Sequence, residues 1–189
     1  MTDAPTLRRA RSEDAAAAVP LLVEAMDVLA LELAGAAGLA AAVPVFIELF
    51  QRPGNRYSHE HVWVLDDGGV LAGAILAYPG RDEPALAAAT LGLIAARDPA
   101  RALRHQPESD PDEFYLDALA VPAAQRGRGL AAVMIEGVCA HARAQGFART
   151  GLLVDEAKPG VRQLYQRLGF VVDGERELAG HHYAHMSRG

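Results

Sequence analysis

A glycine-rich segment at residues 126–131 contains the residue types that most directly suggest chemistry. It reads Arg-Gly-Arg-Gly-Leu-Ala and lies between an apolar run that ends at Val121 and another that ends near Gly146. A glycine-rich turn between a strand and a helix presents several backbone N–H groups to one point, and the positive end of the helix dipole adds to them. The segment therefore predicts a binding site for a pyrophosphate group.

The letters of this segment fit two phosphate-binding patterns. From Gly127 they fit G-x-G-x-x-A, the pattern of a dinucleotide-binding turn, and Asp155 at the end of the next predicted strand would then bind a ribose. From Arg126 they fit R-x-x-G-x-A. In a dinucleotide-binding turn the first glycine follows the strand almost at once, whereas residues 122–126 intervene here. The spacing therefore favours the second pattern.

A second motif, VRQLYQRLGF, follows at residues 161–170. The two segments together resemble the GNAT superfamily of N-acetyltransferases, in which a strand leads into R/Q-x-x-G-x-G/A and a helix, and L-Y-x-x-x-G-F follows downstream. The matching positions are Arg126, Gly129, Ala131, Leu164, Tyr165, Gly169 and Phe170. The resemblance is close over residues 114–170, and the rest of the chain is similar only in the order of its elements.

The resemblance implies that acetyl-CoA is the acyl donor and that it binds at this loop. The residues it implies for cofactor binding are Leu119, Ala120, Val121, Arg126, Gly127, Arg128, Gly129, Leu130 and Ala131. Lys158 stands where relatives often carry an asparagine that helps to hold the cofactor arm. This departure puts one cofactor contact in question: Lys158 either reaches a cofactor phosphate or is a solvated residue at a helix start.

The activity that the resemblance implies is direct transfer of an acetyl group to the primary amine of a small molecule or a peptide. The amine must be neutral when it attacks, the oxyanion needs a hydrogen-bond donor, and the departing thiolate benefits from a proton. In the family a main-chain N–H near the end of the strand before the loop donates to the oxyanion, and this position corresponds to residues 119–121 here. The family tyrosine that matches Tyr165 supplies the proton to the thiolate. Asp117, on the same strand, is the candidate base or amine-holding residue.

An alternative function is an acyl-CoA-binding sensor or regulatory module that has lost turnover. Tyr165 favours the enzyme, because a binding module has no use for an acid beside the leaving group. Release of CoA in the presence of amines discriminates the two.

Several histidines are candidates for contact with the acceptor. His182 and His185 lie in the last predicted hairpin, together with His181, and are the predicted substrate-binding residues. His59 and His61 are expected on one face of a strand. Since no cysteine or carboxylate lies at a recognisable ligand spacing, we predict no metal site.

The elements that must position these residues follow from turn residues and hydrophobic periodicity. They predict one mixed α/β (α+β) domain over residues 1–189, with a mostly antiparallel central sheet, a V-shaped splay and flanking helices. The expected order begins with a strand at 6–11, a long helix from Ser12 to the Gly35–Gly38 region kinked at Pro20, a helix at 39–51 and a hairpin that turns at 66–69. An insertion at 79–112, with a helix and an exposed acidic end, precedes a strand at 113–121, a helix at 129–145, a strand at 150–156, a short helix at 159–170 and a closing hairpin that turns near 179–180.

Composition limits the partners and the compartment. A net charge of −6 with dispersed arginines argues against a nucleic-acid partner. No apolar run suits a signal peptide or a membrane span, so we expect a cytoplasmic protein without a membrane partner. Cys139 is expected to be a small buried apolar residue. The strand at 181–188 is expected at the sheet edge, where it would favour a homodimer.

Overall fold

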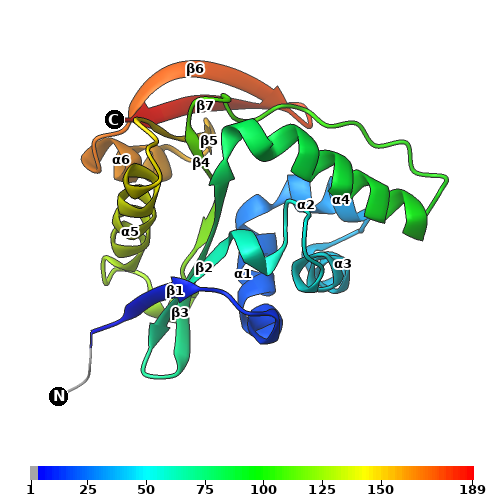
Figure 1. Cartoon of the computed structure of the whole chain (residues 1–189), viewed down its shortest axis with the longest axis horizontal. Helices are drawn as coiled ribbons and strands as arrows, with labels where there is room; N and C mark the ends of the chain where they lie inside the picture. The colour runs from blue at the N-terminus through cyan, green and yellow to red at the C-terminus, as the bar shows by residue number, and fades with distance from the viewer. Residues whose placement is uncertain (1–3) are drawn as a thin grey trace.

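The computed structural model describes residues 4–189 as one open seven-stranded sheet with helices on both faces (Figure 1). This mixed, mostly antiparallel architecture confirms the predicted fold class. The strands, in the order in which they lie in the sheet, are β1 (Thr6–Arg9), β2 (Val62–Asp67), β3 (Val70–Pro79), β4 (Phe114–Ala120), β5 (Thr150–Asp155), β7 (His181–Arg188) and β6 (Val171–Leu178). Only β4 and β5 pair in parallel.

The α-helices are α1 (Ala15–Met26), α2 (Val28–Ala34), α3 (Leu39–Gln51), α4 (Glu83–Arg97), α5 (Leu130–Ala144) and α6 (Pro159–Arg167). Helices α1–α4 lie on one side of the sheet, and α5 and α6 lie on the other (Figure 1). Residues 62–65 of β2 are all apolar because helices cover both faces of the strand. Val62 and Val64 pack into the core with α1 and α3, and Trp63 and Leu65 pack into the core with α5.

The predicted long first helix is two helices. Pro20 lies inside α1 without ending it, and the break falls at Asp27, whose φ is 52°. Aspartate is one of the few residues besides glycine that tolerate a positive φ. The residues on both sides of Asp27 favour a helix, so the local sequence does not mark the break. The packing of the two helices decides it.

The last strand is not at the sheet edge, contrary to prediction. Strand β7 pairs with β5 on one side and with β6 on the other, so β6 forms the edge. The hairpin connection alone does not say which of its two strands inserts beside β5. The homodimer stays a prediction, and its predicted basis in an exposed β7 edge was wrong.

The acidic end of the insertion was predicted to be exposed, and this was wrong for three of its residues. Glu108, Ser109 and Glu113 are buried, whereas Gln106 and Asp112 are exposed. The carboxylate of Glu83 on α4 accepts hydrogen bonds from the backbone N–H groups of Glu108 and Ser109, both at 2.9 Å. This contact holds residues 108 and 109 against α4 and covers them.

Among residues 4–189, no single helix is both long and apolar enough to cross a membrane. Helices α2 and α3 satisfy that test of length and composition only as a pair, and they meet at a bend of 66°. Much of α3 is buried: Ala42, Val45, Phe46, Leu49 and Phe50 belong to the core.

Gly151 on β5 packs closely against the side chain of Glu113, which follows the insertion. A Cβ at this position would overlap the carboxylate of Glu113, which is fully buried and bonded to Arg149 and His185. Because Glu113 cannot swing away, Gly151→Ala is expected to lower the free energy of unfolding by about 1–3 kcal/mol. Chemical denaturation measures the change.

Gly92→Ala is the matched control, because a Cβ at this position of α4 meets open space. It is expected to stabilise the protein by roughly 0.5–1 kcal/mol through helix propensity. Equal changes in the free energy of unfolding in the two variants would contradict the close packing of Glu113 against Gly151.

Candidate active site

The parallel pair β4 and β5 separates along its length. The strands pair only from Phe114 and Thr150 to Leu116 and Leu152, although β4 continues to Ala120 and β5 to Asp155. Beyond the last pair their facing main-chain groups have no partner on the other strand. A cleft of about 250 Å³ lies between them, and we call it the splay cleft. It confirms the predicted V-shaped splay.

The glycine loop follows β4 and leads into α5. Gly127 and Gly129 have φ values of 79° and 76°, and a Cβ at either position would meet nothing within 4 Å. Positive φ favours glycine, and the open space leaves the backbone approachable. The first turn of α5, which begins at Leu130, has N–H groups without helical partners. This geometry fits a pyrophosphate group.

The three predicted cofactor-binding cations are paired with carboxylates: Arg126 with Glu24 at 2.9 Å, Arg128 with Asp67 at 3.0 Å, and Lys158 with Asp27 at 3.8 Å. All three cationic side chains are at least 44% exposed. Exposed pairs of this kind contribute at most about 1 kcal/mol. The cations can therefore exchange their carboxylates for a phosphate at little cost.

Tyr165 on α6 lines the splay cleft, opposite Leu119 at the end of β4. Its ring packs edge-on against Phe170 with centroids 5.9 Å apart. Burial raises the pKa of Tyr165 to about 12, so the phenol is protonated at neutral pH. Tyr183 on β7 lines the same cleft, and burial also raises its pKa to about 12. Motif analysis missed Tyr183, because nothing local marks it.

Asp117 also lines the splay cleft, and it is the extra residue of a β-bulge. Leu76 on β3 pairs with Ala118 and Ala77 pairs with Leu116, which leaves Asp117 without a partner in the ladder. Bulges of this kind redirect a side chain and are common beside active sites. Asp117 Oδ2 accepts hydrogen bonds from Tyr78 and from Arg56, both at 2.7 Å.

Arg56 joins Asp117 to two further carboxylates. Its guanidinium lies 2.5 Å from Glu108 and 4.0 Å from Glu83, and all four side chains are no more than 11% exposed. We call these four residues the Arg56 cluster. Burial raises the pKa of Glu108 to about 7, although Arg56 opposes the shift. Sequence reasoning missed Arg56, Glu83 and Glu108, since they come from three segments far apart in the chain.

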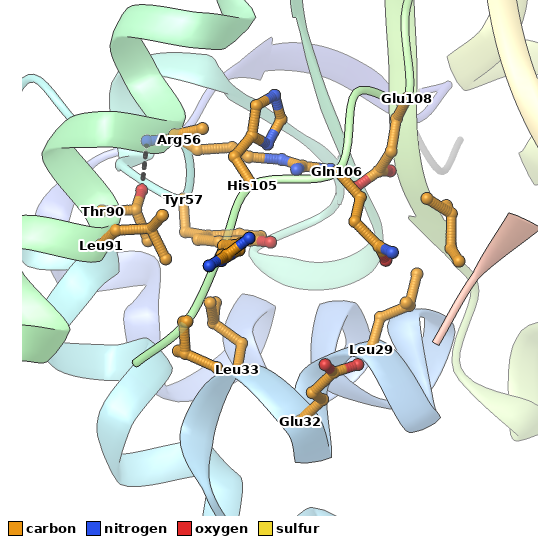
Figure 2. A pocket seen from close by; sticks show the side chains of 14 residues that line it. Leu29, Glu32, Leu33, Arg56, Tyr57, Thr90, Leu91, His105, Gln106 and Glu108 are labelled. Carbon is orange, nitrogen blue, oxygen red and sulfur yellow. Dashed lines mark hydrogen bonds and ion pairs between the residues drawn. The ribbon is translucent and has the colours of Figure 1, made fainter. Parts of the chain in front are cut away.

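A second cavity of about 90 Å³ lies between α2, α4 and the segment before β4, and we call it the side cavity (Figure 2). Leu29, Glu108 and Leu178 line both this cavity and the splay cleft. Arg56 and Glu108 enter it from different elements and point toward one another (Figure 2). The two spaces therefore meet at Glu108.

The histidines are placed differently from prediction. His182 is exposed on β7, and neither it nor His185 lines the two cavities described here. His181 lines the splay cleft instead. His59 and His61 belong to a short 3-10 helix rather than to a strand. The structure thus does not bring His182 or His185 together with Tyr165, and their contact with an acceptor rests on the resemblance alone.

His185 belongs to a buried polar group under β6. Its Nδ1 lies 2.5 Å from Asp173 and its Nε2 lies 3.1 Å from Glu113. Burial lowers the pKa of His185, but the hydrogen bonds to these carboxylates outweigh it and raise the pKa above its usual value. Asp110, Glu113 and His185 have ligand atoms within 4.8 Å of one another. Arg149 already pairs with both of these carboxylates, at 2.7 and 3.3 Å, which favours an ion-pair network over a metal site.

The sequence model of the Acetyltransferase (GNAT) family matches residues 38–170, which is more than half of the chain and includes both motifs. The chain belongs to the GNAT family. Rat (Rattus norvegicus) N-acetyltransferase 8F1 is 26% identical over 121 residues, and rat N-acetyltransferase 8 is 26% identical over 113 residues. These matches cover 64% and 60% of this chain but only 44% and 40% of the relatives, so the chain spans less than half of their length.

Solved structures of acetyltransferases share the fold over nearly the whole chain. An N-acetyltransferase from Staphylococcus aureus Mu50 has a TM-score of 0.82 and 24% identity, with 97% of this chain and 100% of that chain covered. A structure described as an acetyltransferase has a TM-score of 0.77 and 26% identity, with coverage of 97% and 98%.

Proposed function

We propose that this GNAT protein transfers the acetyl group of acetyl-CoA to the primary amine of a small molecule or a peptide. The observation that carries the proposal is an open glycine loop that follows β4, together with a protonated tyrosine in the cleft that β4 residues also line. Family membership and the names of the relatives support acyl transfer.

The loop and the cleft would bind different parts of acetyl-CoA. The backbone of Gly127 and Gly129 and the first turn of α5 suit a pyrophosphate, with Arg126 and Arg128 beside them. Beyond Leu116 the β4 strand does not pair with β5, and Leu119 lines the splay cleft there. Ala120 and Val121 lead on toward the loop, and the carbonyl of Val121 accepts a hydrogen bond from Arg126 at 3.0 Å. Lys158 lines the same cleft and has only a weak exposed partner, so it can reach a phosphate.

Acetyl-CoA, when bound, supplies a thioester that a neutral amine can attack. The β4 main chain at residues 119–121 would donate a hydrogen bond to the carbonyl oxygen of the thioester, where negative charge develops. Tyr165 would give its phenolic proton to the departing sulfur. Asp117 would act on the acceptor side, as a base or by holding the amine, because it lines the same cleft from β4.

Release of free CoA tests the proposal directly. The purified protein, given acetyl-CoA and a panel of primary amines and peptides, is expected to release thiol faster than the background with at least one acceptor, and mass spectrometry is expected to show a gain of one acetyl group. The control is the same mixture with N-methylated tertiary amines, which cannot form a stable amide. Tight CoA binding without release for any acceptor would instead indicate the silent sensor.

A further inference from the structure

Glu108 occupies the point where the splay cleft and the side cavity meet. It lines both, and it comes from the segment between α4 and β4 rather than from either motif (Figure 2). Only about 11% of its side chain is exposed. A group that bridges the two spaces lies where an acceptor in the side cavity would face a thioester in the splay cleft.

The Arg56 cluster contains more negative than positive groups. Three carboxylates, those of Glu83, Glu108 and Asp117, surround the single guanidinium of Arg56. Buried negative charge without a partner is costly, and a cation that enters the site relieves the cost. Of these three carboxylates only Glu108 lines the side cavity, where Glu32 is the other acidic residue and Arg56 and Arg104 are the basic ones. Glu108 is therefore the buried carboxylate that an ammonium group in this cavity would meet.

Glu108 is the member of the cluster that lines both cavities and has a weakly held carboxylate oxygen. Asp117 Oδ2 already accepts two hydrogen bonds of 2.7 Å, and Glu83 accepts two backbone N–H groups. Glu108 Oε2 has only the hydroxyl of Tyr115, at 3.2 Å, which is long for an O–H to oxygen bond. One oxygen of Glu108 is thus weakly held.

We propose that Glu108 is the base that takes a proton from the ammonium group of the acceptor, and that the side cavity holds the apolar body of this primary amine. The inference rests on the proposed acetyl transfer. The apolar walls of the side cavity support it: Leu29, Leu33, Ala87, Leu91, Leu103 and Leu178. They fit an amine with a compact hydrocarbon body.

The proton balance of the reaction is complete. The ammonium group gives one proton to Glu108 and becomes a neutral amine. Its nitrogen forms the bond to the acyl carbon while the bond from that carbon to sulfur breaks. Tyr165 protonates the sulfur and regains a proton from the nitrogen. Glu108 then releases its proton to solvent, so one proton leaves for each amide formed.

The pH dependence of the reaction rate follows from the protonation state in which Glu108 can act as a base. Glu108 acts only when it is deprotonated, so kcat/KM is expected to rise as the pH increases through about 7, where the pKa of this carboxyl lies. The titratable and charged groups that surround it from every neighbouring element are Arg56, Tyr57, Tyr78, Glu83, His105, Tyr115, Asp117 and Tyr183.

Glu108→Gln is the direct test, because it keeps the shape and removes the basic oxygen. With an amine from a series that runs from n-butylamine to phenethylamine, it is expected to lower kcat by roughly 100- to 1,000-fold and to abolish the rise near pH 7, with a smaller change in KM. Glu13→Gln, an exposed change remote from both cavities, is expected to keep the wild-type profile.

Two variants exclude neighbouring groups as the source of the pH dependence. His105→Gln is expected to keep the rise near pH 7, since burial lowers the pKa of this histidine below its usual value. Asp117→Asn is expected to keep a rise but to move it to lower pH, since the charge of Asp117 is one of the causes that raise the pKa of Glu108. Loss of the rise in Asp117→Asn together with its retention in Glu108→Gln would assign the base to Asp117 and overturn the inference.

A measurement on the unmodified protein covers the case in which Glu108→Gln does not fold. Carbon NMR of labelled glutamate carboxyl groups is expected to show one glutamate that titrates near pH 7, and n-butylamine is expected to lower its midpoint, because an adjacent ammonium favours the carboxylate. A spectrum in which every glutamate titrates below pH 6 would overturn the inference. An amine-dependent midpoint in a protein that releases no CoA would overturn the proposed transfer, and with it the basic role of Glu108.

Discussion

Gly129→Glu is expected to lower the affinity for CoA at least about 100-fold. The substitution places a carboxylate in the open space beside the first turn of α5, where a pyrophosphate would receive backbone N–H groups, and it removes charge-assisted hydrogen bonds worth about 1.5–3 kcal/mol each. Isothermal titration calorimetry with CoA measures the loss. NADH is expected to show no binding in the same instrument, because the turn is too long for a dinucleotide.

The control must separate charge from backbone strain, since Gly129 has a φ of 76°. Gly129→Ala carries the same strain without the charge, and it is expected to lose less affinity than Gly129→Glu. Gly92→Glu adds the same charge on α4, remote from the loop, and is expected to bind CoA as the wild type does. Unchanged CoA affinity in Gly129→Glu would remove the loop from the binding site.

Tyr165→Phe is expected to lower turnover by roughly 10- to 1,000-fold while the affinity for acetyl-CoA changes little. The hydroxyl is the only group removed, and it acts on the leaving sulfur in the transition state more than on the bound ground state. Because the pKa of Tyr165 is about 12, the phenol keeps its proton through neutral and mildly alkaline pH, and its role predicts no loss of rate there. Single-turnover kinetics with the best acceptor isolate the acetyl-transfer step.

Tyr183→Phe is the comparison variant, since Tyr183 lines the same cleft and also has a pKa of about 12. A larger loss in Tyr183→Phe than in Tyr165→Phe would move the acid from α6 to β7. Full turnover in both variants would leave water as the proton donor to the thiolate.

The sequence alone predicted the proposed donor side of this protein. Glycines at positions 127 and 129, the arginine at 126 and the tyrosine at 165 lie in short contiguous motifs, and a positive φ, an open backbone and a helix start are local properties of such segments. The α3 helix, the hairpin of β2 and β3, and the turn at Ala179 and Gly180 were likewise predictable, because periodicity and turn residues act over a few positions.

The proposed acceptor side depends on tertiary structure. Glu108 belongs to a polar run that composition marks as exposed, yet contacts with Glu83, Arg56 and Tyr115 bury it beside the splay cleft. These partners lie between 7 and 52 positions away in the chain, so no local pattern brings them together. The same holds for the break at Asp27 and for the place of β7 between β5 and β6. Burial and charge pairing between distant segments depend on how the whole chain packs, and they set both the position and the basicity of the Glu108 carboxylate.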